Sequence, residues 1–158
     1  MIVKQFIKNK NGFIFVVLLI SSIFLFNGCG VTSKEDIISI VDTKSEDLNE
    51  IVKQFVESDK ENMHAALEGE NVESVETIQY YHYESGNPII EFCCESSGFV
   101  SNSSYYGFYY SFDGKPVGYQ GMPVSLREYE DGWSGEMDGN TYYTEQIKEK
   151  WYYYEMHF

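Results

Sequence analysis

The sequence of 158 residues has few basic side chains, few cysteines and none of the common metal or nucleotide motifs. It has 11 Lys and Arg against 25 Asp and Glu, which gives a formal charge of −14. This balance excludes a nucleic-acid partner, because phosphate contacts need clustered basic side chains. The three histidines stand in no HExxH or Cys–His zinc spacing, and no CxxC pair occurs. We therefore predict no metal and no cofactor.

What the chain has in abundance is aromatic residues, which make up 17% of it and lie mostly in its second half. All 14 tyrosines fall between Tyr80 and Tyr154. With 43% hydrophobic residues, the chain is too apolar to stay disordered, and its length predicts one domain.

The first 29 residues have the three zones of a secretory signal peptide. Lysines 4, 8 and 10 precede an apolar run of 14 residues, Phe13–Phe26, and Gly28 and Cys29 follow it. Fourteen helical residues rise about 21 Å, whereas the hydrocarbon core of a bilayer is roughly 30 Å thick. The run is short for a permanent span, although a retained signal anchor stays an alternative to cleavage at Cys29.

The segment Leu25-Phe26-Asn27-Gly28-Cys29 resembles the lipobox of bacterial lipoproteins. The resemblance implies that the Cys29 thiol receives a diacylglyceryl group and that the signal peptidase cuts before it. We therefore expect residues 1–28 to be a lipoprotein signal peptide and Cys29 to anchor the protein to the extracytoplasmic face of the cell membrane. Without the three leader lysines, 8 basic and 25 acidic side chains remain, a charge of −17 that anionic headgroups repel.

Residues 29–44 are interpreted as the lipidated cysteine and a tether, and residues 45–158 as a single domain. Five apolar residues have the spacing of one helix face: Leu48, Ile51, Val52, Phe55 and Val56. Ser45 is a suitable N-cap for this helix. A second helix is indicated from Ser58 to Gly69, and the pattern leaves open whether there is one helix or two.

From residue 72 onward, the pattern is that of strands separated by turns. Turns at Gly86-Asn87, Asp113-Gly114 and Asp131-Gly132 predict three hairpins, formed by residues 72–84 with 88–95, 105–112 with 115–120, and 124–130 with 133–137. A turn at Asp138-Gly139, one helical turn over 144–150 and a strand over 151–158 follow. The predicted fold class is α+β, with one or two helices before an antiparallel β-meander of about six strands. The last hairpin would place Arg127 opposite Glu136.

Two segments of the aromatic half resemble uncharacterised lipoproteins of low-GC Gram-positive bacteria. They are GFYYSFDGKPVGYQG at residues 107–121 and NTYYTEQIKEKWYYYEMHF at residues 140–158. This resemblance supports the assignment as a lipoprotein and implies no activity.

Strand alternation suggests where a ligand would bind. A two-residue loop at Gly86-Asn87 pairs Tyr81 with Phe92 on a core face and leaves Tyr80 on a solvated face, together with Tyr105 and Tyr109. Exposed tyrosine rings stack on sugars or on the apolar surface of a protein. We therefore expect a non-enzymatic binding module for a protein or glycan. The alternative at this point is that the second sheet face is covered and the tyrosines serve packing.

Two other groups of residues, the carboxylates of the third hairpin and the adjacent cysteines, could take part in chemistry. Five carboxylates lie near the third hairpin: Glu128, Glu130, Asp131, Glu136 and Asp138. Because a glycosidase needs two carboxyl groups across a cleft, a small surface hydrolase is the alternative function. Cys93 and Cys94 would point to opposite faces of a strand, so we expect free buried thiols rather than a disulfide.

Overall fold

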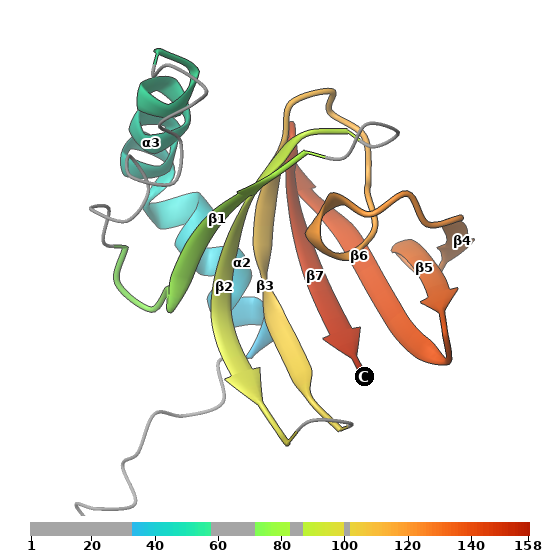
Figure 1. Cartoon of the computed structure of the whole chain (residues 1–158). Coiled ribbons are helices and arrows are strands. Elements are labelled where there is room, and N and C mark those ends of the chain that lie inside the picture. The colour runs from blue at the N-terminus through green and yellow to red at the C-terminus, as the bar shows by residue number, and fades with distance from the viewer. Residues whose placement is uncertain (1–32, 58–71, 83–86, 100–101) are drawn as a thin grey trace, which may run out of the picture. The chain divides into compact units, whose positions relative to one another are not determined.

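The computed structural model describes residues 33–57, 72–82, 87–99 and 102–158, all within the compact unit Thr32–Phe158. Figure 1 shows two helices beside one antiparallel sheet. The helices are α2 (Lys34–Thr43) and α3 (Ser45–Glu57). The strands are β1 (Thr77–Tyr81), β2 (Ile89–Ser97), β3 (Ser104–Ser111), β4 (Arg127–Tyr129), β5 (Gly132–Met137), β6 (Asn140–Lys148) and β7 (Trp151–His157), and the short 3-10 helix η2 (Tyr119–Gly121) precedes β4. The predicted signal peptide and the helix predicted over 58–69 lie outside the described residues.

Helix α2 occupies residues that the sequence analysis placed in a tether. Ser33 caps it: the Ser33 hydroxyl accepts a hydrogen bond from the Asp36 backbone N–H at 3.1 Å, and the Asp36 carboxylate accepts one from the Ser33 N–H. Ile37, Ile40 and Val41 form one buried face. The tether prediction was therefore wrong for residues 34–43, because an i, i+3, i+4 apolar stripe belongs to the folded core.

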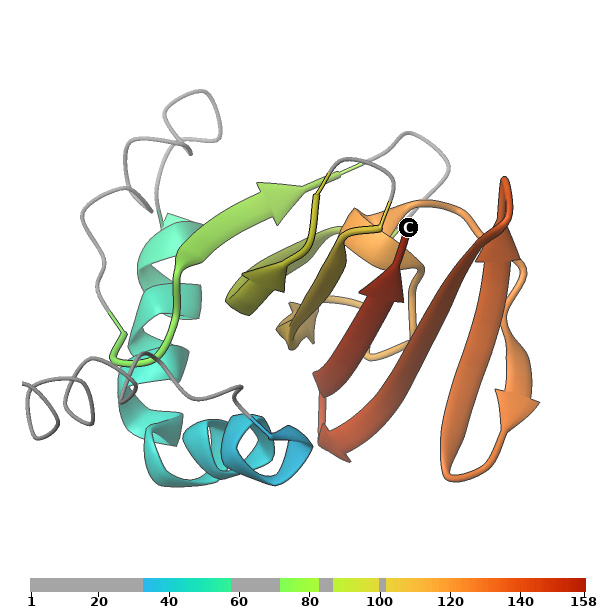
Figure 2. The ribbon, with the colours of Figure 1, turned by 90° about the horizontal axis from the view of Figure 1, so that it is seen from below.

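Helix α3 begins at Ser45, as the sequence predicted. Leu48, Ile51, Val52 and Phe55 are buried, which confirms the helix face. Val56 is 63% exposed and lies outside this face. Figure 2 shows α2 and α3 meeting at a sharp angle beside one face of the sheet.

The sheet has seven strands in the order β1-β2-β3-β7-β6-β5-β4, and every pair is antiparallel. The α+β class is confirmed, with seven strands where about six were expected. The meander is interrupted once, because β7 returns to pair with β3. Residues 112–126, which we call the η2 loop, carry the chain from β3 to β4 at the far edge of the sheet.

The predicted hairpins are corrected by this topology. Residues 115–120 form no strand, and β6 replaces the helical turn expected over 144–150. Tyr81 pairs with Ile89 rather than Phe92, because the first connection is longer than a two-residue turn. Arg127 pairs with Ser134 rather than Glu136, because the chain reverses at Glu130-Asp131. The turn at Asp138-Gly139 is confirmed, with φ of 52° and 82°.

Both faces of the sheet are covered, each by a different part of the chain. On the helix face, α2 and α3 pack on Ile90, Phe92, Cys94, Phe108, Trp151 and Tyr153. On the opposite face, the η2 loop contributes Val117 and Tyr119 to a cluster with Ile89, Tyr109, Tyr142, Tyr152, Tyr154 and Met156. Figure 1 shows the η2 loop in front of β6 and β7, with α2 behind the sheet. The second face is therefore not solvated.

We predict that α2 contributes directly to the stability of the domain. Ile37 is fully buried, so Ile37→Ala is expected to lower the free energy of unfolding by about 2–5 kcal/mol, through lost burial and the cavity it leaves. The matched variant Val56→Ala removes an exposed side chain and should change it by less than about 0.5 kcal/mol. Urea unfolding measures both variants. Equal effects would contradict the burial of α2.

Candidate functional site

A polar groove lies over the outer strands of the sheet, on the same face as α2. It has a volume of about 350 Å³. Its lining comes from the first residue of α2, from the β4–β5 hairpin, and from β6 and β7: Lys34, Tyr129, Glu130, Ser134, Thr141, Tyr142, Tyr143, Glu155 and His157. We call this hollow the β4–β7 groove.

The register of the strands explains why these side chains meet. Ser134 pairs with Tyr143, and Tyr143 pairs with Glu155, so that the three form one row across β5, β6 and β7. Thr141 pairs with His157 in the next row on the same face. Since neighbouring rows of one face are two residues apart, the alternation of β6 and β7 places this polar set together.

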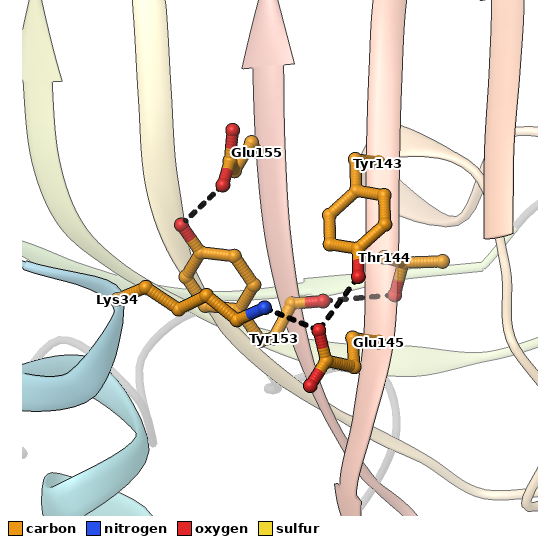
Figure 3. Close-up of polar contacts among 6 residues, drawn as sticks. All are labelled: Lys34, Tyr143, Thr144, Glu145, Tyr153 and Glu155. Carbon is orange, nitrogen blue, oxygen red and sulfur yellow. Dashed lines mark hydrogen bonds and ion pairs between the residues drawn. The ribbon is translucent and has the colours of Figure 1, made fainter. Parts of the chain in front are cut away.

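The inner wall of the groove is a charged cluster around Lys34, which Figure 3 shows. The Lys34 ammonium pairs with the Glu145 carboxylate and lies 5.4 Å and 5.5 Å from the ring centres of Tyr143 and Tyr153. The Tyr143 hydroxyl donates to Glu145 at 2.6 Å. Burial raises the pKa of Glu145, but the hydrogen bonds from Lys34 and Tyr143 outweigh it and hold that pKa below its usual value. An ammonium group is thus bound here by two rings and one carboxylate.

A second polar chain runs along β7. The Tyr153 hydroxyl donates to Glu155 at 2.9 Å (Figure 3). Glu155 in turn lies 3.5 Å from His157 Nε2. His157 Nδ1 is 2.9 Å from the Ser104 hydroxyl on β3. The groove floor therefore presents a carboxylate that is fixed in place by its neighbours.

The outer wall is open and aromatic. Tyr129 is 54% exposed, and its ring meets Tyr143 edge to face at 6.3 Å. A second hollow of about 370 Å³ shares Tyr129, Ser134 and Thr141 with the groove. It adds Arg127, Glu128 and Glu136 from the β4–β5 hairpin. The linings of the two hollows place this exposed ring among four carboxylates and two basic side chains, Lys34 and Arg127, and the excess of negative charge attracts cations.

The structure does not bring the three predicted ligand-binding tyrosines together. Tyr80 is half-buried on the helix face, with its ring 4.6 Å from that of Phe55. Tyr105 lies on the opposite face beside Tyr119, and Tyr109 is 1% exposed beneath the η2 loop. The exposed tyrosine patch was therefore a wrong prediction. Two features of the structure explain the error. The longer connection after β1 changes the pairing register of β1 with β2, and the η2 loop covers the second face of the sheet.

The predicted carboxylates lie in two places. Glu130 lines the β4–β7 groove, and Glu128 and Glu136 line the adjoining hollow. Asp131 and Asp138 lie in the turns on either side of β5. All five are exposed, whereas a general acid of a glycosidase is kept protonated by an apolar pocket. The arrangement lends no support to the hydrolase alternative.

The two cysteines point to opposite faces of β2, as predicted, and both are free and buried. Burial raises the pKa of Cys93 to about 11 and that of Cys94 still further, so neither is an activated nucleophile. In the described ranges, no three His, Cys, Asp or Glu side chains are placed to hold a metal ion.

Four residues of the groove, Lys34, Tyr143, Glu155 and His157, are not among the site residues predicted from the sequence. Their signal is the alternation of polar residues along 140–158, where Tyr143, Glu155 and His157 share one face. Lys34 has no such signal, because its segment is predicted from the sequence to be a tether.

Comparisons with protein-family models, with curated proteins and with solved structures found no match to this chain. Within the described residues, neither of the two α-helices has the length and apolar character of a membrane span.

We predict that Lys34→Met lowers the free energy of unfolding by about 1 kcal/mol at neutral pH, because it removes an ion pair and two ring contacts. Glu145 has a lowered pKa in the folded state, so this contribution is present above its unfolded pKa and is lost as the pH falls through the folded value. The difference from wild type should therefore shrink in acid. Lys53→Met, which breaks an exposed pair with Glu50, is the control and should cost less. Urea unfolding at several pH values tests this; equal costs would refute it.

Proposed function

We propose that this chain is a lipid-anchored cell-surface protein whose domain is a non-enzymatic binding module, and that its ligand binds in the β4–β7 groove. The observation that carries this proposal is an open polar groove with a half-exposed tyrosine, Tyr129, at its outer wall. The anchor rests on the lysines, the apolar run and the lipobox-like segment that ends at Cys29.

The chemistry of the groove favours a cationic protein segment over a neutral glycan. Glu130 and Glu155 line it together with Tyr129 and Tyr143. The domain already holds one ammonium group in this manner, since Lys34 lies over Tyr143 and pairs with Glu145. A lysine of a partner would meet the same elements, a ring face and a carboxylate, at the outer wall. The charge of −17 on the chain without its leader would attract such a partner at long range.

The anchor is tested by labelling. Cells that express the full chain are grown with an alkyne fatty acid, and label is measured on the wild type and on Cys29→Ser. We expect label on the wild type alone, because the thiol is the acylated group, and we expect the variant to keep its leader. Equal label on both proteins would contradict the anchor.

The groove is tested with two probes, a tetralysine peptide and the neutral sugar chitotetraose, by amide chemical shifts of the wild-type full chain held in uncharged detergent micelles. Tetralysine is expected to shift amides of β4–β7 around Tyr129. Tyr129→Ala leaves the charge unchanged but removes the ring, so it should weaken binding by about threefold to fivefold.

Val56→Ala, which removes an exposed apolar side chain from α3, is the matched control and should leave binding unchanged. Shifts spread over the acidic surface and insensitive to Tyr129→Ala would mean general charge attraction and would overturn the groove as a site. Chitotetraose binding in the groove, without tetralysine binding, would make the ligand a glycan.

A further inference from the structure

Glu91 is a buried carboxyl group on β2, the strand next to the edge strand β1, away from the β4–β7 groove. It is 5% exposed and lies on the face of β2 that the η2 loop covers. The Gln120 backbone N–H in η2 donates a hydrogen bond to it. Gln120 has φ of 55°, a left-handed conformation that is unusual for this residue type. The strained residue of the loop is thus the one that meets Glu91.

No positive charge accompanies this carboxyl group. Among the described residues, Glu91 takes part in no ion pair. Five titratable side chains face it, one each from β2, β3, η2, β6 and β7: Cys93, Tyr109, Tyr119, Tyr142 and Tyr154. Tyr81 of β1 lies beside Tyr119. Every one of them is an acid, so none can neutralise a carboxylate. Burial accordingly raises the pKa of Glu91 to about 8.

A buried hydroxyl group, that of Tyr154, lies beside Glu91 without a well-formed hydrogen bond. Tyr154 is 1% exposed, and its ring passes over Gly107, where a Cβ would come within 2.9 Å of it. Its hydroxyl lies beside Glu91 and Cys93, yet it makes no hydrogen bond of normal geometry. A protonated Glu91 has an O–H to donate as well as oxygens that accept, so the neutral acid fits a site of hydroxyls and one N–H.

We propose that Glu91 is a neutral carboxylic acid whose proton keeps the η2 loop docked on the sheet, so that loss of this proton releases the loop. A carboxylate at this position would be a buried charge with one N–H and one tyrosine hydroxyl beside it and no cation among the described residues. Undocking the loop admits water to Glu91 and relieves this cost. The loop has a second attachment, because the Val117 N–H donates to the Tyr109 hydroxyl at 3.1 Å. The loop around Gln120 is therefore expected to open before the whole domain unfolds.

The η2 loop leads directly into β4, the edge strand that carries Tyr129. Val124 and Leu126 pack against Gly135 of β5, at 3.0 Å and 3.1 Å from the position of a Cβ there. Release of the loop would therefore loosen the outer wall of the groove. This consequence rests on the proposed function, whereas docking of the loop does not.

The direction of the pH effect follows from the raised pKa. A group whose folded pKa lies above its unfolded pKa stabilises the fold below the unfolded value and loses that contribution as the pH rises through the folded one. From about pH 5 to about pH 8 the folding equilibrium constant should therefore fall, by up to about tenfold per pH unit. Glu145, with its lowered pKa, acts below this window.

Urea unfolding of the full chain between pH 5 and 8.5 tests the proposal with E91Q and E149Q. Glu91→Gln is neutral at every pH and should lack the fall. Glu149→Gln removes an exposed carboxylate on the β6–β7 turn and should follow wild type. Identical pH profiles for wild type and E91Q would overturn the proposal.

Two measurements on the wild type keep the test decisive where E91Q fails to fold. Hydrogen exchange, corrected for its intrinsic pH dependence, should show the Gln120 and Val117 amides losing protection above pH 8 before β2 and β3 do. Infrared spectra should show the carbonyl stretch of a protonated carboxyl group at pH 7 that disappears by pH 9. Unchanged loop protection, or absence of that band at pH 7, would refute the proposal.

Discussion

The structure depends on one constraint: a sheet rich in tyrosine is buried on both faces, and each buried hydroxyl group then needs a hydrogen-bond partner. Tyr109 shows how this is met. Its hydroxyl accepts from the Val117 N–H and lies 2.9 Å from the Thr144 hydroxyl, which donates to the Tyr153 carbonyl. One relay thus joins the η2 loop to β3, β6 and β7. A leucine in place of Tyr109 would fill similar space but leave both Val117 and Thr144 without this partner.

On the other face, polar contacts fix the position of α2, which does not extend over the outer strands of the sheet. Lys34 pairs with Glu145 at the first turn of α2, and Lys148 donates to the Val41 carbonyl at 2.7 Å near its last turn. Two side chains of β6 therefore hold both ends of one helix. Lys148 also meets a helix C-terminal carbonyl, where a cation is favoured. Because α2 is fixed over the inner strands, the polar rows of β5, β6 and β7 beyond it stay open, and this opening is the β4–β7 groove.

Local patterns predicted much of the fold. The spacing of Leu48, Ile51, Val52 and Phe55 located α3, and Asp138-Gly139 located a turn, because both depend on neighbours in the chain. The pairing of β3 with β7 could not be predicted in this way, since about forty residues separate them and no turn joins them. The Asp113-Gly114 turn predicts a hairpin from the sequence, but in the structure the chain continues from it into a loop that covers one face of the sheet. Such an outcome depends on which surface remains uncovered, a property of the assembled sheet.

The site was less predictable than the fold, for a reason that lies in the charges. With 25 acids and 11 bases, carboxylates are spread along the chain from Glu35 to Glu155, so a cluster of them in the sequence has little meaning. What distinguishes them is where the few cations go. Lys34 pairs with Glu145, Lys44 pairs with Glu73, and Lys148 lies near Asp42, whereas Glu91 pairs with no lysine or arginine among the described residues. A carboxyl group that is buried without a cation avoids the cost of a buried charge by keeping its proton. The scarcity of basic residues, which the composition already shows, thus leads in the folded chain to two kinds of carboxyl group: carboxylates paired with a lysine, such as Glu145, and one neutral acid beneath the η2 loop.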